Sequence, residues 1–442
     1  MSEKTDKPTV YVVHCIDVEG PMTETLEATW ERIYNEDRIW MNVEPSRENL
    51  LKLQAGQLDL PGLDAEAIRY LQGKYSPANL AYLTSWEQID ASIEPAVSRG
   101  FRQDHADSKG GPYIYSWFIY DHYGFTNNPR FHDVGIHRIY DHYHDLFLRD
   151  DPQGDGVYWH YHHVAASGDA LEWNPSWTTN GVPEEILARR IIERGWFPSV
   201  FRAGGHIERN DLSHWLEMFI PFDYSLRTPH GLNTDAMRGC VYDWRNAPSE
   251  WGYYHPDWYD YRRPGPMNRY LIRCLDLRTW ILSLTETDVQ EAFDKAREDG
   301  VTVLAYYNHD YRDMATDVEH GYGLLQKVGR QNPDVQWRFA NALEAAQALT
   351  GQHDKAPTFR CQLEGSRLTI ASDEDLFGPQ PFLAIKENGR FFRDNTTAEG
   401  PREWVYVFRR PEEVEAFGLA GCSAAGNVGV FVHDSRLSDW PW

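Results

Sequence analysis

The chain of 442 residues is long enough for two or three domains, and its hydrophobic content of 41% supports a sizeable core. Its 67 acidic and 43 basic residues give a formal net charge of -24, which disfavours binding to the phosphate backbone of a nucleic acid. No stretch reaches the roughly 18 consecutive apolar residues of a membrane span, and the polar N-terminus is not followed by the apolar segment of an export signal.

The five cysteines are scattered, odd in number and never arranged as a C-x-x-C pair. This pattern argues against a disulfide framework and against a thiolate zinc site, and it fits a reducing compartment. We therefore expect a cytoplasmic protein with no nucleic acid partner and no membrane span. The sequence gives no indication of an oligomeric state.

The first predicted strand covers residues 8–17, and the polar residues at its end are the strongest functional signal in the chain. The apolar run stops at Asp17 and Glu19, which are followed by Gly20. Residues at i and i+2 of an extended chain point to the same side, so both carboxylates can face one site. Because α/β folds carry their chemistry at the C-terminal ends of parallel strands, we expect catalysis or metal binding here. The alternative is a strand-terminal turn with a capping aspartate.

Residues 22–110 contain helix-like patches and few strand signals, which predicts an insertion. A second strand is predicted over residues 111–120 and a third over residues 157–164. In the third strand His160 and His162 point to one face, whereas His163 points to the other. Two imidazoles on one face, together with a carboxylate, suit zinc or another borderline divalent ion. The alternative is a chance H-x-H sequence in a chain with 18 histidines.

The later elements repeat one pattern, in which a strand ends at polar residues and a helix follows. A strand over residues 197–205 stops at Arg202 and two glycines, and a strand over residues 301–310 ends in Asn308, His309 and Asp310. The remaining predicted elements are strands at 222–225, 270–276 and 281–284, and helices at 183–194, from an N-cap at Asn210, at 288–299 and at 335–349. This alternation is typical of a parallel β/α sheet or barrel, in which the strand ends converge at one mouth.

Two further segments have a distinct composition. Beyond residue 351, short alternating runs without intervening helices predict a small antiparallel β domain over residues 356–442. Residues 244–261 contain seven Trp and Tyr side chains among polar, Pro and Gly residues. So many rings cannot all pack inward, so we expect some of them to be available for stacking on sugar rings, while most aromatic residues of the chain serve the core.

Four of these motifs resemble those of the polysaccharide deacetylases of the NodB-homology group, carbohydrate esterase family four, over roughly residues 8–350. Cys-Ile-Asp17-Val-Glu19-Gly is similar to the first motif, which implies that Asp17 is the catalytic base and Glu19 a metal ligand. His160-Tyr-His162 resembles the second motif, which implies two histidine ligands. The family spaces these histidines H-x3-H and more often has Asp in place of Glu19, so the choice among His160, His162 and His163 stays open.

The other two motifs supply the remaining roles. Phe201-Arg202-Ala-Gly-Gly resembles the third motif, which implies that Arg202 holds the base in place. Tyr307-Asn-His309-Asp310 is similar to the last motif, which implies that His309 is the general acid.

The resemblance implies a distorted (β/α) barrel of NodB-homology type over residues 1–350, with an insertion at about 22–110. It further implies a metal-dependent hydrolase that removes an acetyl or formyl group from the nitrogen of an amino sugar, with zinc as the favoured ion. A cytosolic sugar precursor of a surface polysaccharide is the expected substrate. The alternatives are an amidohydrolase that cleaves a non-sugar C–N bond and a catalytically silent glycan-binding protein.

Overall fold

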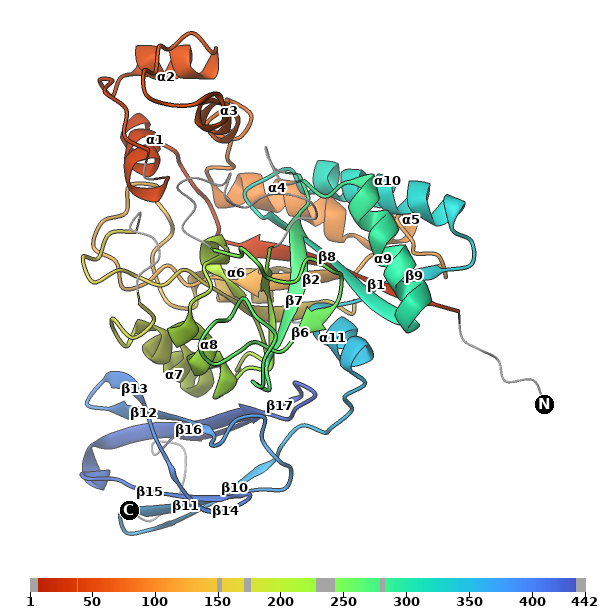
Figure 1. Cartoon of the computed structure of the whole chain (residues 1–442). Helices are drawn as coiled ribbons and strands as arrows, with labels where there is room; N and C mark the ends of the chain where they lie inside the picture. Colours follow the sequence, from red (N-terminus) through yellow and green to blue (C-terminus); the bar gives the residue numbers. More distant parts are fainter. Residues whose placement is uncertain are drawn as a thin grey trace, which may run out of the picture.

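The computed structural model describes residues 7–37, 39–148, 153–170, 176–227, 243–278 and 283–434. Its centre is a closed barrel of seven parallel strands, as predicted (Figure 1). Each strand pairs with the next, and β1 closes the ring by pairing with both β2 and β8. In chain order the seven strands are β1 (Thr9–Val18), β2 (Tyr115–Ile119), β3 (Gly156–Tyr161), β4 (Val200–Ala203), β5 (Phe222–Leu226), β7 (Tyr270–Asp276) and β8 (Val301–His309).

The alternation of side chains along β1 determines which of its residues face the interior of the barrel. Val13 and Cys15 belong to the buried cluster inside the barrel, whereas Val12 and Ile16 pack with the surrounding helices. The same period of two places Asp17 on the interior side at the C-terminal end of the strand. A run of apolar residues buried on both faces therefore ends in a carboxylate that faces the barrel axis.

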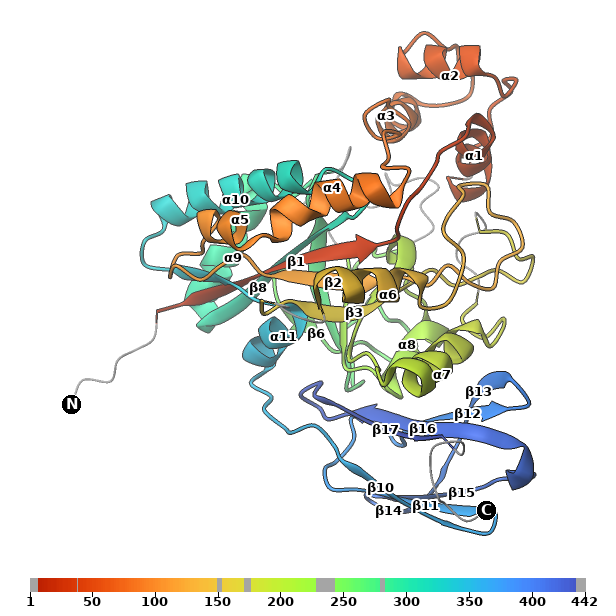
Figure 2. The same ribbon diagram turned by 180° about the vertical axis from the view of Figure 1, so that it is seen from behind.

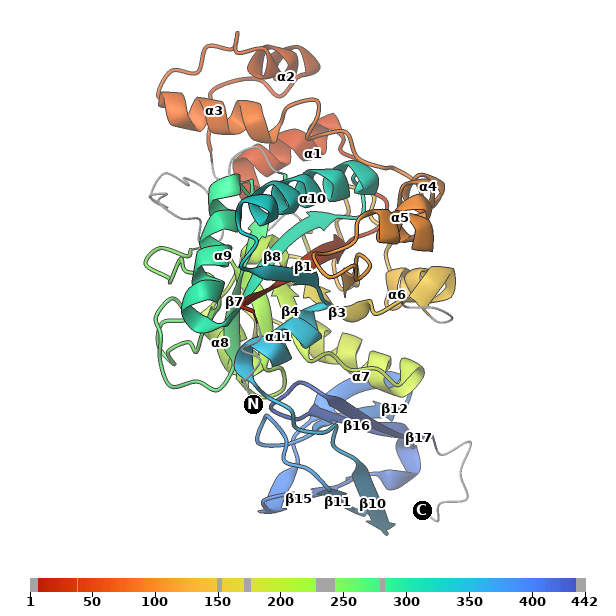
Figure 3. The same ribbon diagram turned by 90° about the vertical axis from the view of Figure 1, so that its right-hand side faces the viewer.

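Helices surround the barrel on all sides (Figure 3). Several begin at a residue whose side chain accepts a hydrogen bond from the first turn, such as Ser85 before α4 and Thr285 before α9. The surrounding helices are α4 (Trp86–Val97), α5 (Arg99–Asp104), α6 (Arg138–Tyr143), α7 (Val182–Arg194), α8 (Asn210–Glu217), α9 (Glu286–Asp299), α10 (Met314–Gln331) and α11 (Ala342–Thr350).

Three helices between β1 and α4 project beyond the end of the barrel at the top of Figure 1. They are α1 (Leu26–Glu31), α2 (Arg47–Gln54) and α3 (Ala65–Lys74), and they enclose a small apolar core of their own. Within that core the Asp37 carboxylate accepts hydrogen bonds from Tyr70, Lys74 and Tyr75 at 2.5–2.7 Å. The segment therefore has the helical character that the sequence indicated.

Some predicted elements differ from the structure. The helix predicted at 335–349 is a strand, β9 (Gln336–Phe339), followed by the shorter α11, because residues 336–339 pair in parallel with the first residues of β1, Thr9–Val12, which β2 does not reach. The N-cap of α8 is Arg209 rather than Asn210. The long helix α10 was not predicted, and the strand expected at 281–284 lies partly outside the described residues.

The antiparallel character predicted for the C-terminal region is confirmed by two four-stranded sheets, which pack face to face around a shared apolar core (Figure 2). One sheet contains β10 (Phe359–Glu364), β11 (Arg367–Ser372), β15 (Glu403–Val407) and β14 (Thr397–Gly400), and the other β13 (Arg390–Asp394), β12 (Phe382–Glu387), β16 (Val414–Cys422) and β17 (Val428–Asp434).

The second of these sheets packs against α7 of the barrel. Phe382, Ala384 and Ala420 belong to the same buried cluster as Ile191. A Cβ atom at Gly418 would lie 2.5 Å from Ile191, so a glycine permits this close approach. Among the described residues, none of the helices is long and apolar enough to cross a membrane.

The aromatic segment 244–261 divides into an inner and an outer set. Trp244, Trp251, Tyr254 and Tyr261 are buried. Three rings are exposed, with exposed fractions of 41% for Tyr253, 39% for Trp258 and 88% for Tyr259. β6 (Tyr253–Tyr254) pairs antiparallel with β7 and attaches the segment to the barrel.

Candidate active site

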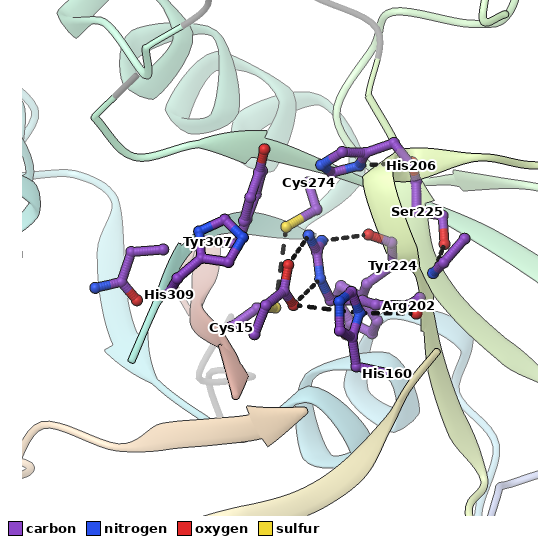
Figure 4. A network of polar contacts seen from close by, with 12 residues as sticks. Cys15, His160, Arg202, His206, Tyr224, Ser225, Cys274, Tyr307 and His309 are labelled. Carbon is purple, nitrogen blue, oxygen red and sulfur yellow. Dashed lines mark hydrogen bonds and ion pairs between the residues drawn. The ribbon is translucent and has the colours of Figure 1, made fainter. Parts of the chain in front are cut away.

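The six side chains singled out in the sequence come together at the C-terminal end of the barrel. Asp17, Arg202 and His309 lie on β1, β4 and β8, and His160 lies on β3. Glu19 and His162 each follow a strand by one residue. Figure 4 shows His160 and Arg202 side by side, with His309 across from them. Four strands separated by up to 292 positions in the sequence thus supply one cluster of side chains at this end of the barrel, as expected from the convergence of parallel strand ends.

Asp17 and Arg202 form a buried pair with two hydrogen bonds. Arg202 donates from Nε to Oδ1 at 2.7 Å and from Nη2 to Oδ2 at 2.9 Å, and both side chains are at most 3% exposed. The guanidinium also donates to the carbonyl oxygen of Tyr224 at 2.7 Å and lies 4.2 Å from the ring centroid of Tyr307. Burial alone would raise the pKa of Asp17, but the charge and hydrogen bonds of Arg202, together with His160 and His309, outweigh burial and lower that pKa below its usual value. Asp17 is therefore ionised and fixed in orientation.

Glu19, His160 and His162 offer one ligand atom each within 4.8 Å of one another. The Nε2 atoms of His160 and His162 lie 3.1 Å apart, and Glu19 Oε1 lies 3.7 Å from the first and 3.3 Å from the second. His160 Nδ1 lies 3.1 Å from the carbonyl oxygen of Arg202, which assigns the proton to Nδ1 and leaves the lone pair on Nε2. Two imidazoles and one carboxylate are the donor set that zinc and similar divalent ions prefer, so these residues fit such an ion.

The charge state of Glu19 suits this role. Burial alone would raise the pKa of Glu19, but the neighbouring imidazoles of His160, His162 and His309 together outweigh burial and hold the pKa well below its usual range. Glu19 is therefore present as a carboxylate.

His163, which the sequence left open as a ligand, faces elsewhere. Its Nδ1 lies 2.9 Å from the carbonyl oxygen of Val164 and its Nε2 lies 2.8 Å from that of Trp177. Only one of the two nitrogens of a neutral imidazole carries a proton, but both here face main-chain oxygens rather than the barrel mouth. His160 and His162 are thus the pair that approaches Glu19.

Contacts that the sequence did not indicate fix the main chain of Glu19 in place. Asp310 accepts hydrogen bonds from the backbone N–H groups of Glu19 and Gly20, both at 2.9 Å. On the other side His122 Nε2 lies 2.7 Å from the carbonyl oxygen of Glu19. His122 and His132 stack with ring centroids 3.9 Å apart, and together with Glu19 they form a second group with ligand atoms within 4.8 Å. The only available signal was that the second predicted strand also ends in a polar pair, Asp121-His122.

His309 lies at the edge of the cluster, with its side chain 26% exposed. Its Nε2 lies 3.8 Å from Glu19 Oε1, and its ring stacks on Tyr311 at a centroid distance of 4.7 Å. Burial lowers the pKa of His309 to about 4, although the carboxylates of Glu19 and Asp17 oppose this effect. The imidazole is therefore neutral at pH 7.

A second network, also unanticipated, supports Arg202 from β7. The hydroxyl of Tyr307 donates to Asp276, the last residue of β7, and Arg227 forms an ion pair with the same carboxylate. Because Tyr307 lies against the guanidinium of Arg202, this network restrains the arginine that holds Asp17. The strand at 270–276 was predicted from the sequence, but the function of its terminal carboxylate was not.

No protein-family model matches this chain, and no curated protein sequence matches it. Among solved structures it is weakly similar to a carbohydrate acetylesterase from Xanthomonas citri, with 11% identity and a TM-score of 0.15, covering 64% of this chain and 61% of that one. It is also weakly similar to an endo-β-1,4-mannanase double mutant from Cellulomonas fimi, with 10% identity and a TM-score of 0.22, covering 96% of this chain and 93% of that one. This chain thus spans less than two thirds of the acetylesterase.

Proposed function

We propose that this protein is a metal-dependent hydrolase that removes an acetyl or formyl group from the nitrogen of an amino sugar. The observation that carries the proposal is the grouping at one barrel mouth of Glu19, His160 and His162 with a carboxylate, Asp17, that Arg202 holds by two hydrogen bonds. A nucleophile-activating base beside a two-histidine, one-carboxylate ligand set supports metal-dependent hydrolysis of an amide.

Glu19, His160 and His162 would hold the divalent ion, with zinc as the favoured one. Such an ion supplies Lewis-acid polarisation of the acyl carbonyl and lowers the pKa of bound water from about 15.7 towards 7. The carbonyl oxygen of Arg202 orients the ring of His160, and the contacts of Asp310 and His122 orient Glu19.

The proton transfers fall to Asp17 and His309. Asp17 takes a proton from the attacking water, and Arg202 keeps this carboxylate ionised and aimed. His309 gives a proton to the leaving nitrogen, which would otherwise be a poor leaving group. Because the ring is neutral at pH 7, it takes that proton up from solvent, to which 26% of its side chain is exposed, and Asp17 releases the proton of the attacking water to solvent. The substrate that we propose is an amino-sugar precursor in surface-polysaccharide metabolism.

Elemental analysis of purified protein tests the metal site. We expect one equivalent of a divalent ion in the wild type and its loss in His160→Ala and His162→Ala. His163→Ala is the matched control, because it removes an imidazole from the same segment that faces away from Glu19. Full metal content in all three variants would contradict the assignment.

Turnover on a panel of N-acetyl and N-formyl amino sugars tests the chemistry. Asp17→Asn and His309→Ala should each reduce the rate by about 10²–10⁴-fold, the usual contribution of general acid–base catalysis. Near-full activity of Asp17→Asn would refute the role of the base. Hydrolysis of non-sugar amides in preference to the sugar panel would instead identify an amidohydrolase of another substrate class.

A further inference from the structure

Ser225 lies in β5, beside the strand that carries Arg202, and it is fully buried. β4 and β5 pair through their main chains at Val200 and Phe201. Beyond these pairs the N–H of Ala203 donates to Ser225 Oγ at 2.7 Å. A side chain thus continues the contact between the two strands at the position that follows Arg202. The proposed catalytic steps do not use this hydroxyl.

The N–H of Ala203 and the carbonyl of Arg202 belong to one peptide group, which connects the two sides of β4. This peptide is planar and trans, so its N–H and its carbonyl point in opposite directions. The N–H meets Ser225 on β5, and the carbonyl oxygen lies 3.1 Å from His160 Nδ1 on β3 (Figure 4). One rigid group of atoms therefore joins the serine hydroxyl to the ring of a proposed metal ligand.

Asp223 sets the direction of the serine hydroxyl. The N–H and the hydroxyl of Ser225 both donate to Asp223 Oδ1, the N–H at 2.8 Å. Because a hydroxyl has a single proton, its donation to Asp223 leaves the lone pairs of Oγ for the N–H of Ala203. The hydrogen bonds from His160 through the peptide and Ser225 to Asp223 therefore all run in one direction. We call this series the hydrogen-bond relay.

A buried arginine keeps Asp223 charged. Arg269 donates through Nη2 to Asp223 and through Nη1 to Glu208 at 3.0 Å, and the three side chains are at most 1% exposed. Burial, with the neighbouring Asp223, raises the pKa of Glu208 well above its usual value despite Arg269. Burial raises the pKa of Asp223 less, because Arg269 and the hydrogen bonds from Ser225 favour its charged form. Glu208 thus keeps a proton, and the relay ends at a carboxylate.

A carboxylate at one end of such a relay strengthens the histidine at the other end as a metal ligand. An imidazole that donates from one ring nitrogen is held in one tautomer and orientation, and its other nitrogen becomes a stronger ligand. Hydrogen bonds in series also polarise one another. In this protein the other nitrogen is His160 Nε2, which lies 3.7 Å from Glu19 Oε1.

We propose that Ser225 and Asp223 are positioning residues, which orient His160 and strengthen its Nε2 as a metal ligand. This inference rests on the proposed function, because it concerns the metal site of the same hydrolase. Loss of the serine hydroxyl leaves the N–H of Ala203 without its acceptor. The peptide is then free to rotate, and its carbonyl no longer fixes the ring of His160.

Zinc affinity, measured on the full-length protein by competition with a chromogenic chelator, tests the relay. We expect Ser225→Ala to bind zinc about 10–100-fold more weakly than the wild type, the usual effect of removing a partner that orients a metal ligand. Asp223→Asn should show a smaller loss, because it removes the charge but keeps the serine hydroxyl. Ser116→Ala is the matched control, since the buried Ser116 Oγ also accepts a main-chain N–H, that of Ala342 at 2.9 Å, and should bind zinc as the wild type does.

Nitrogen NMR of zinc-free protein with labelled histidines follows the relay without a metal. We expect a proton on Nδ1 of His160, with the signal assigned by its loss in His160→Gln. The chemical shift of this nitrogen should change in Ser225→Ala and in Asp223→Asn, and it should not change in Ser116→Ala.

The outcomes separate the relay from the proposed function. Equal zinc affinity in the wild type, Ser225→Ala and Asp223→Asn overturns the relay, and retained deacylation in the same variants leaves the function intact. An equal loss of affinity in Ser116→Ala also overturns it, because the loss then follows from looser packing. If Ser225→Ala does not fold, Asp223→Asn decides. A wild type that binds no zinc, but whose His160 signal responds to both substitutions, would refute the metal site of the proposed function and support the hydrogen bonds of the relay.

Discussion

Replacement of Arg202 by methionine should be among the most destabilising single changes in the barrel. The substitution keeps much of the side-chain volume but leaves the Asp17 carboxylate buried without its partner. Two hydrogen bonds to a charged acceptor are lost, at about 1.5–3 kcal/mol each, and the carbonyl of Tyr224 loses a donor. Breaking a buried ion pair from one side costs about 3–5 kcal/mol, which agrees with that sum. We expect Arg202→Met to lose about 3–5 kcal/mol of the roughly 5–15 kcal/mol that stabilises a typical domain.

Urea denaturation followed by tryptophan fluorescence at pH 7 measures this loss. Because the cost arises from the stranded carboxylate, Asp17→Asn combined with Arg202→Met should cost less than the sum of the single changes, by about 0.5–3 kcal/mol. Arg367→Met is the control, since the pair of Arg367 with Glu399 is about half exposed and should contribute less than about 1 kcal/mol. A loss below about 1 kcal/mol in Arg202→Met, or strict additivity in the double variant, would refute this account of the pair.

Two further changes test the burial and the close packing around the site. Burial lowers the pKa of His14 to about 4, against about 6.5 in an unfolded chain, so the unfolded state binds more protons between these pH values and stability falls as pH drops through this window. His14→Gln should remove a contribution of about 3 kcal/mol to that fall, and identical pH–stability curves for variant and wild type would contradict it. A Cβ atom at Gly204 would lie 2.2 Å from the ring of His162. Gly204→Ala should therefore displace that ring and lower both metal content and activity. The loss of stability should be small, because the ring can rotate away. Gly181→Ala is the control, because its Cβ would lie in open space, and it should retain the wild-type metal content. Wild-type metal content in Gly204→Ala would show that His162 does not hold the ion.

The directions of the side chains at the strand ends could be predicted from the sequence, because side-chain alternation is a local property. Asp17 continues the interior positions Val13 and Cys15, so its direction follows from a period of two. The same period separates His163 from His160 and His162. Local patterns also predicted a parallel β/α sheet or barrel, since each strand carries its own apolar run and its own polar terminus, and the family resemblance favoured the barrel.

The contacts that hold the site in place could not be predicted, because they join segments far apart in the chain. Asp310 bonds to the N–H of Glu19 across 291 positions, and His122 reaches the same residue across 103. No periodicity in either segment specifies that contact. Likewise, residues 336–339 form a strand because β2 pairs only with residues 14–18 of β1 and leaves the edge of residues 9–12 open, and this tertiary pairing overrides the helical pattern of the segment.

The two kinds of side chain in the site are held in different ways, and this difference separates base alignment from metal affinity. Asp17 lies within β1, and Arg202 within β4 aligns it, so the proposed base is fixed by the barrel itself. Glu19 and His162 each lie one residue beyond a strand, where the sheet no longer fixes the backbone, and contacts from Asp310 and the absence of a side chain at Gly204 determine their positions. Substitutions just beyond the strands, around Glu19 and His162, should therefore alter metal binding without moving Asp17. Changes within β1 and β4 should affect both stability and the position of Asp17.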